Sequence, residues 1–333
     1  MSGYMENFTE DALLSPPTKR VCTKASTIRT KSSDSRRWRF KHIALHMQII
    51  LSIIWMSLLP AVCGLARTAM KGASNLSPFE NAFLRSRLDE IKIGIEKDYS
   101  ARILADETGT QTFIFPGAGG VDPLVLELQA SNPGSKIIDW KDYRGNFLTA
   151  SYDSEAVGEA VAGLVLESIK KSGDGDNKET LSVSNIRFIG VSVGAFAANA
   201  AATVVYKQTT ANSKTTNEGD SCDPVGVDLI LLDPFCARGV AGPNYGRDFF
   251  GKHATTALQI LNTDDPVPTT NDPLPFCYCI DVTDAPEKQD FVLLPGDSMH
   301  SWPLAYFARH YSIDYTTDAA STNFPRGIVK KVA

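Results

Sequence analysis

The residues best suited to chemistry form the run Gly190-Val191-Ser192-Val193-Gly194, which stands between a strand-like and a helix-like stretch. A sharp turn of this kind holds its serine in a strained conformation with the hydroxyl exposed, and small flanking residues let the chain fold that tightly. A serine at a helix N-terminus also gains from the helix dipole, which stabilises developing negative charge. The run therefore predicts a nucleophile elbow at Ser192. The alternative is an ordinary strand–helix turn whose serine only caps the helix.

A nucleophilic serine needs a general base, and the chain after residue 72 has three histidines, His253, His300 and His310. His300 follows the apolar run 291–294, which we predict to be the last strand, and a doubly wound sheet binds its ligands beyond the carboxyl ends of the strands. His253 instead precedes a strand, and His310 lies in a helix-like stretch. We therefore predict His300 as the base that takes the Ser192 proton.

A carboxylate must hold the imidazole of such a base, and two aspartates meet this need. Asp233 follows the apolar run 228–232, and Asp265 follows the run 257–261 and a short turn. Both would lie at the carboxyl edge of the sheet, and both fit the chain order Ser, Asp, His. Each also precedes a proline, and an aspartate in a turn is common. The residues alone leave Asp233 and Asp265 as alternatives.

An oxyanion hole needs two N–H groups in place before the reaction begins. One would be that of Val193, directly after the nucleophile. The other would come from the glycine-rich loop 116–120, where Gly117 and Ala118 are the candidates and Ala118 is the one we choose. A phosphate-binding role for this loop is disfavoured because the lysine of the P-loop pattern is missing.

No cofactor and no metal are expected. A serine triad works without a cofactor, and Cys277 and Cys279 have only one residue between them, fewer than the spacings of zinc ligands. We do not expect these two cysteines to pair with each other. For the cysteines after residue 72, the sequence leaves open whether they form one or two disulfides or stay as buried thiols.

The elements that must position these residues alternate between strands and helices. Strand-like runs cover 112–115, 136–140, 187–191, 228–232, 257–261, 276–282 and 291–294. One helix-like stretch begins at Ser77, and two others cover 156–169 and 195–206. This alternation predicts a mostly parallel, doubly wound sheet flanked by helices, in one domain spanning 75–333. The polar segments 172–185 and 208–223 read as surface loops. The segment 235–250 is either a small apolar lid or an ordinary connection.

The N-terminal region differs from the rest in charge and hydropathy. Residues 1–72 carry 11 Lys or Arg and 4 Asp or Glu, whereas the remainder carries 22 and 34, an acidic balance that argues against nucleic acid as a partner. Residues 1–41 are polar and basic and predict a disordered tail. Residues 43–66 lack any charged side chain, so 42–66 is expected to be a transmembrane signal-anchor or a signal peptide. Either places the protein in the secretory pathway, and an anchor would leave its N-terminus cytosolic.

Several of these segments together resemble the α/β-hydrolase fold, and within it the pancreatic-lipase-like group. The similarity runs over about residues 110–312 and includes Phe113 to Ala118, Ile138-Asp139-Trp140, Ile189 to Ala195, Leu232-Asp233-Pro234 and His300 to Tyr306. The resemblance implies Asp233 as the acid, although Asp265-Pro266-Val267-Pro268 is similar to the acid loop of the wider fold. It implies ester hydrolysis, with lipids as the substrate class. The group's vertebrate members carry a large disulfide-bounded lid just before the histidine, for which the segment 281–299 is too short. They also carry a C-terminal β-sandwich, which we do not expect in the 33 residues after His300.

The sequence thus predicts a membrane-anchored or secreted lipase or carboxylesterase that acts through Ser192, Asp233 and His300. Two other functions stay open. One is a catalytically silent hydrolase-fold binding protein tethered to a membrane, and the other is a thioesterase or acyltransferase that uses the same triad.

Overall fold

The computed structural model describes residues 78–104, 109–145, 149–173, 183–213, 225–238, 244–293, 297–311 and 324–332. The predicted tail 1–41 and apolar segment 42–66 lie outside these ranges, and so does Cys222. Within the described ranges, no helix is both long enough and apolar enough to cross a membrane.

Seven parallel strands form one sheet in the order β2-β1-β3-β4-β5-β6-β7. The strands are β1 Gly109–Phe115, β2 Lys136–Ile137, β3 Val183–Val191, β4 Gly226–Leu232, β5 Thr256–Leu261, β6 Tyr278–Asp281 and β7 Val329–Lys331. The central strands are buried almost without interruption, as expected when helices cover both faces of a parallel sheet. The prediction of a parallel α/β sheet is confirmed.

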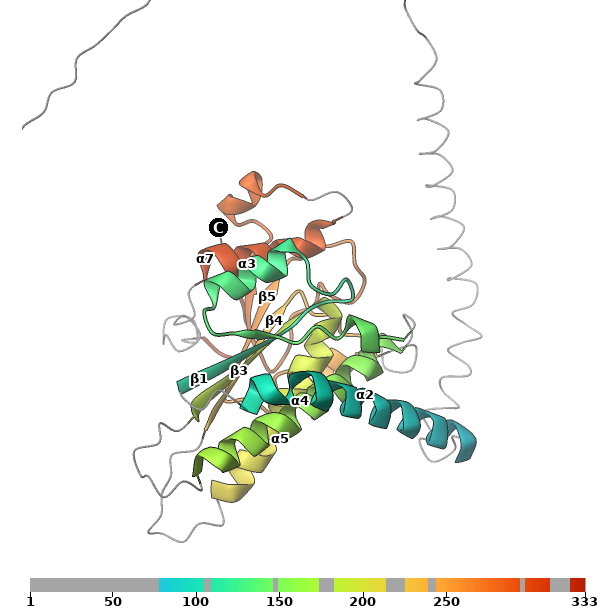
Figure 1. The fold of residues 1–333 in the computed structure, drawn as a ribbon. Helices are drawn as coiled ribbons and strands as arrows, with labels where there is room; N and C mark the ends of the chain where they lie inside the picture. The colour runs from blue at the N-terminus through green and yellow to red at the C-terminus, as the bar shows by residue number, and fades with distance from the viewer. Residues whose placement is uncertain are drawn as a thin grey trace, which may run out of the picture. The chain divides into compact units, whose positions relative to one another are not determined.

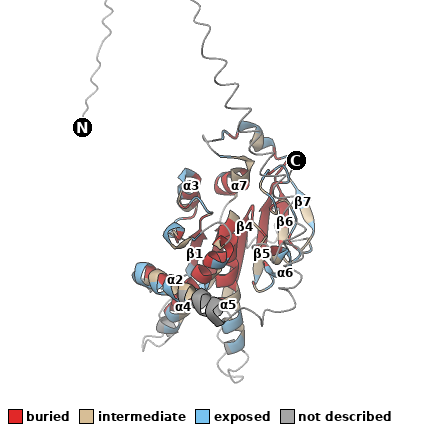
Figure 2. Cartoon of the chain, turned by 90° about the vertical axis from the view of Figure 1, so that its right-hand side faces the viewer, coloured by how far each residue is buried: buried red, intermediate tan, exposed pale blue. Residues whose placement is uncertain are grey.

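Helices cover both faces of this sheet. They are α2 Pro78–Leu104, α3 Pro123–Ser131, α4 Ala150–Gly173, α5 Ala195–Ser213, α6 Tyr245–Phe249 and α7 Trp302–His310. Residues of α2, α4 and α5 share one buried cluster with the sheet, and residues of α3 and α7 share the other. Figure 1 shows α3 and α7 above the sheet and α2, α4 and α5 below it, and Figure 2 shows the buried residues concentrated on the strands between them.

The strand order contains one reversal, and it decides where a ligand could bind. From β1 the chain moves outward to β2 and then returns past β1 to β3, after which the sheet grows in the other direction. The connections after β1 and β3 therefore diverge, and in open parallel sheets this switch point, beyond the carboxyl ends of the two strands, is where ligands bind. The loop 116–120 and Ser192 begin at those two ends.

Three details differ from the predicted elements. Residues 291–293 are not a strand: they follow the 3₁₀ helix η3 Pro286–Asp290, and Val292 is 79% exposed. The edge of β6 that such a strand would need is occupied by β7, which the sequence did not suggest. The predicted loops are also shorter, because α4 continues to Gly173, β3 begins at Val183 and α5 continues to Ser213. The rest of both loops lies outside the described residues.

The described cysteines are buried thiols, one of the two alternatives that the sequence left open. Cys236, Cys277 and Cys279 are buried free thiols, so Cys277 and Cys279 do not pair with each other. Burial raises the pKa of the Cys236 thiol to about 12 and that of Cys279 to about 11, which makes both poor nucleophiles at neutral pH.

Candidate active site

Ser192 stands on a strained turn between β3 and α5. It opens the 3₁₀ turn η2 Ser192–Gly194, and its φ is 53°. The turn requires glycine on both sides. A Cβ at Gly190 would lie 2.7 Å from Ala195 Cα, and one at Gly194 would lie 2.5 Å from Pro116 O. Both atoms belong to the backbone and cannot move aside, so small residues are needed here for the reason given in the sequence analysis.

Backbone strain gathers at this edge of the sheet. Among the described residues, the non-glycine residues with positive φ are Ser192, Asp233 at 45° and Thr269 at 71°. For a β-branched residue such as Thr269 this conformation is an outlier, and each instance costs about 1–3 kcal/mol. Strain of this kind concentrates at functional sites, and here it coincides with two of the predicted site residues.

Neighbouring elements hold the elbow from two sides. The Ser154 hydroxyl on α4 donates to Val193 O at 3.1 Å and accepts from Ala197 N at 3.1 Å. From the other side, Phe235 N donates to Ser192 O at 3.1 Å. Ser192 is therefore held by α4 and by the segment after β4 as well as by its own strand.

The glycine-rich loop after β1 lies against Ser192. A Cβ at Gly117 would be 3.2 Å from Ser192 Cβ, so only a glycine lets the loop backbone approach this closely without a shift. A tight turn places Ala118 at its exposed tip, with Gly120 N donating to Gly117 O at 3.0 Å. The buried indole of Trp140 donates to Pro116 O at 2.8 Å and fixes the loop from behind. Val193 directly follows Ser192, and Ala118 follows Gly117, the residue that lies against it. The role of Val193 and Ala118 as oxyanion donors stays a prediction.

Strand register brings the two aspartates to the same edge as Ser192. Val191 pairs with Leu232, and Leu232 pairs with Ile260, so the residues that follow β3, β4 and β5 end side by side. Asp233 N continues the ladder by donating to Ile260 O at 3.0 Å. Asp265 comes four residues after the end of β5.

Both aspartates contact the same nitrogen of His300. Its Nδ1 lies 2.9 Å from Asp233 Oδ2 and 2.8 Å from Asp265 Oδ2. Both carboxylates are buried, whereas the His300 side chain is 19% exposed. The other ring nitrogen, Nε2, is buried and has no hydrogen-bond partner. The structure therefore unites His300 with both candidate acids and leaves Nε2 free to accept a proton.

Electrostatics at this cluster follow from burial and from the three charges. Burial raises the pKa of Asp233 to about 7, against the opposing effect of His300, and the charge of Asp265 adds to the rise. Burial lowers the pKa of His300, but its bonds to Asp233 and the two carboxylate charges more than offset this and leave that pKa raised. The cluster thus favours an imidazolium, the species formed when His300 takes a proton from serine.

One residue of this site was missed by sequence reasoning. Asn262 is fully buried, its backbone N donates to Asp233 Oδ1 at 3.4 Å, and its side-chain amide donates to Met299 O at 2.9 Å, next to His300. Its side-chain oxygen accepts from Lys288 Nζ at 3.0 Å. Asn262 therefore links the ends of β5 and η3 to the histidine segment. Sequence reasoning could have found Asn262 from its position, since it is a polar residue directly after a buried strand.

The other histidines lie elsewhere. His253 precedes β5, at the opposite end of the strand from Asp265, and its ring lies 6.2 Å from that of Tyr206. His310 ends α7 and its ring lies 5.2 Å from that of Tyr306. Neither has a recorded contact with Ser192 or with the two carboxylates, so the structure singles out His300.

Asp233, Asp265 and His300 are also the one group of three in the described residues whose donor atoms lie close enough to share a cation, within 4.8 Å of one another. We assign no cation to them. The separations from Nδ1 are those of direct hydrogen bonds, and Asp265 Oδ2 already accepts from Thr270 Oγ1 at 2.6 Å.

Both described parts of the segment 235–250, residues 235–238 and 244–250, contact α4. The Arg238 guanidinium forms an ion pair with Glu155 and lies over the rings of Tyr152 and Tyr245, 4.5 and 4.7 Å from their centroids. The Tyr245 hydroxyl donates to the same Glu155 at 2.8 Å. These contacts favour an ordinary connection over a hinged lid.

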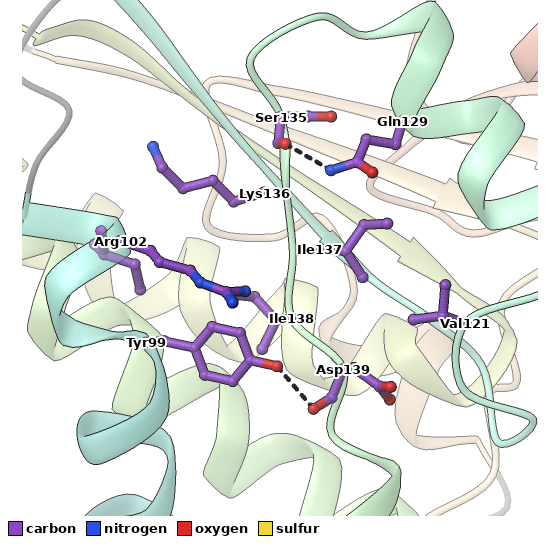
Figure 3. A pocket seen from close by; sticks show the side chains of 10 residues that line it. Tyr99, Arg102, Val121, Gln129, Ser135, Lys136, Ile137, Ile138 and Asp139 are labelled. Atoms are coloured by element: carbon purple, nitrogen blue, oxygen red, sulfur yellow. Dashed lines mark hydrogen bonds between the residues drawn. The ribbon is translucent and has the colours of Figure 1, made fainter.

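A cavity of about 390 Å³ lies between α2, α3 and β2, as Figure 3 shows. The Tyr99 hydroxyl crosses it to Asp139 O at 2.9 Å, and the Gln129 amide bonds Ser135 O at 3.1 Å. Its lining includes none of the site residues, and β1 stands between β2 and β3. It is therefore separate from the region around Ser192.

No protein-family model, curated protein or solved structure matches this chain. The functional conclusion therefore depends on the geometry of the site itself.

Proposed function

We propose that this protein is a serine hydrolase of carboxylic esters with an α/β-hydrolase fold. One observation supports this above all. At a single sheet edge, a serine stands on a strained elbow after β3, and the carboxylates that follow β4 and β5 hold Nδ1 of an imidazole whose Nε2 is unbonded. This is the arrangement of roles by which a serine triad is recognised, whatever the chain positions.

The reaction proceeds in two halves. His300 Nε2 takes the proton of Ser192 Oγ while Oγ bonds to the ester carbonyl carbon, and the carbonyl electron pair moves onto its oxygen. The N–H groups of Val193 and Ala118 donate to that oxyanion. As the carbonyl re-forms, the bond to the alkoxide breaks, and the His300 proton passes to the departing alcohol.

The acyl-enzyme then reacts with water. His300 Nε2 takes a proton from water, the hydroxide oxygen bonds to the acyl carbon, and Ser192 Oγ leaves with the proton from His300. The products are a carboxylic acid and the regenerated serine, with no cofactor consumed. In the structure Ser192 is not bonded to Nε2, and catalytic hydrogen bonds of this kind commonly tighten only when substrate is present.

Lipid esters are the substrate class that we propose. Support comes from the resemblance of the sequence to the pancreatic-lipase-like group, which implies lipids as the substrate class.

The test uses the full-length protein and a fluorophosphonate probe, which reacts with an activated serine. Wild type and Ser131→Ala, a control at a half-buried serine on α3 away from the site, should label equally, and Ser192→Ala should not label. A folded wild type that does not label would leave the silent binding protein as the better account. With labelling established, product analysis in water and in added alcohol or thioester substrates separates a hydrolase from an acyltransferase or thioesterase.

For the location of the protein, we propose that residues 43–66 anchor it in a membrane with the N-terminus in the cytosol, or are cleaved from a secreted form. Alkaline carbonate extraction of expressing cells decides between them. An anchored protein stays with the membranes, and a secreted one appears shortened in the medium. Full-length protein in the cytosolic supernatant would contradict both.

A further inference from the structure

The two carboxylates at His300 compete for a single hydrogen. The imidazole Nδ1 carries one N–H, yet Asp233 Oδ2 and Asp265 Oδ2 both lie within 2.9 Å of it. Both side chains are at most 1% exposed, so water does not screen their mutual repulsion. Two buried carboxylates this close do not both ionise freely, and they divide the charge according to their other partners.

Asp265 has the stronger set of partners. Its Oδ1 accepts from Val267 N at 3.0 Å, and its Oδ2 accepts from Thr270 Oγ1 at 2.6 Å. Thr269, next to Thr270, is held at positive φ, so the loop is strained in the conformation that presents these donors. The Val267 N–H is a fixed donor, whereas the Thr270 hydroxyl has one hydrogen and also lies 2.9 Å from Val267 O and 2.8 Å from Asn271 Oδ1. Both donors stabilise the charged form of the Asp265 carboxyl group.

Asp233 is placed differently. Apart from His300 and the neighbouring Asp265 carboxyl group, it accepts from Asn262 N at 3.4 Å, a long contact. The charged and titratable groups around the cluster do little to assist it. Lys288 bonds Asn262, Thr283 and Asp264 instead, and the Cys236 thiol remains neutral. Asp233 is therefore the carboxyl group that gains least from being ionised, and its raised pKa agrees with this.

We propose that both aspartates position His300 with divided roles: Asp265 is the carboxylate that stays ionised, and Asp233 is a second carboxyl that becomes charged when Asp265 is absent. This rests on the proposed function, because the roles are defined by the base that they serve. It also explains why the structure brings two aspartates to one imidazole.

The division has a measurable consequence for the single and double variants. Asp233→Asn keeps the ionised partner, so its labelling rate should stay within about 10-fold of wild type. Asp265→Asn leaves Asp233 to ionise without a negative neighbour, so its rate should fall by about 10- to 100-fold. The double variant loses both and should fall by about 10⁴-fold, the loss seen when a triad has no carboxylate.

The experiment measures the fluorophosphonate labelling rate of the full-length protein from pH 5 to 9. Asp272→Asn, an exposed carboxylate on the same loop, is the control and should behave as wild type. One single variant equal to the double, with the other equal to wild type, would show that one aspartate acts alone and would overturn the proposal.

A further variant keeps the test valid if Asp265→Asn or the double variant does not fold. Thr270→Val removes a donor to Asp265 and leaves both carboxylates in place. It should slow labelling more in the Asp233→Asn background than in wild type, because Asp265 is then the only carboxylate. Equal effects in the two backgrounds would contradict the division of roles.

NMR titration of the His300 imidazole, assigned by its loss in His300→Gln, needs no catalysis. Each single variant should lower the pKa of His300, and the double variant should lower it most. If wild type does not label but these shifts appear, the proposed function fails and the shared positioning stands. If only one aspartate moves the pKa, the shared positioning fails.

Discussion

Gly158 on α4 lies against the backbone of α5, below the elbow, and we predict that Gly158→Ala destabilises the protein. A Cβ at this position would lie 2.7 Å from the backbone C and 2.8 Å from the Cα of Ala197 on α5, and closer still to its carbonyl oxygen. All three are backbone atoms, so no side chain can rotate away. The helices must separate, or α5 must shift along α4.

The magnitude follows from two opposing effects. Overpacking of a close contact costs about 1–3 kcal/mol, and here the obstacle is backbone, which favours the upper end. Replacing glycine by alanine within a helix returns about 0.5–1 kcal/mol. Separation also stretches the two Ser154 bonds to Val193 O and Ala197 N, each worth about 1 kcal/mol. The expected net loss is about 1–3 kcal/mol, with slower labelling of Ser192 because those bonds hold the elbow.

Urea unfolding followed by circular dichroism measures this loss, and α4 provides the matched control. Gly163 lies on the same helix, is exposed, and a Cβ there meets nothing within 4 Å. Gly163→Ala should therefore stabilise the protein by about 0.5–1 kcal/mol. If Gly158→Ala raises the midpoint as Gly163→Ala does, with the same denaturant slope, the close approach of α4 and α5 is refuted.

Three further predictions concern the site and the core. Trp140→Phe removes the indole donor to the loop after β1 and should cost about 1–3 kcal/mol in urea unfolding, with slower probe labelling of a folded protein. Asp228→Asn breaks the buried ion pair with Arg187 and should cost about 3–5 kcal/mol, and a loss below 1 kcal/mol would show that the pair does not support the sheet. The folded-state pKa of Asp233 is raised, so the folded state holds that proton more tightly than the unfolded chain, and stability should fall as pH rises from about 4 to 7. In Asp233→Asn, the midpoint of urea unfolding should fall less between these pH values than in wild type. The substitution Asp290→Asn, at an exposed carboxylate, should leave the pH dependence of the midpoint unchanged.

The sequence by itself determined the class of the fold and the local setting of the nucleophile. Long apolar runs separated by helical periodicity are typical of buried parallel strands, and the structure has such a sheet. Two glycines around Ser192 predicted a sharp strand–helix turn, and the structure has a backbone there that admits no larger residue. These features depend on residues near one another in the chain, so local patterns report them.

The sequence misjudged the run 291–294 for a related reason. Its composition suits a strand, but a strand also needs an unoccupied edge, and β7 occupies the edge of β6. Composition carries no information about which edges are already paired. The short strand β7 has only a weak pattern of its own, with two of its three residues exposed.

Only the tertiary structure decided how the acids, the base and their supports are arranged. Asp233 and Asp265 follow neighbouring strands in similar turns, and no local feature shows that both reach the same nitrogen of His300. The contact of Asn262 could not be predicted from local sequence either, since its side-chain amide donates to a carbonyl 37 residues away. Strand register and loop closure set these distances, and the charges interact through the buried space that results. That is why the sequence indicated which residues could react, whereas the structure determined which of them meet at His300.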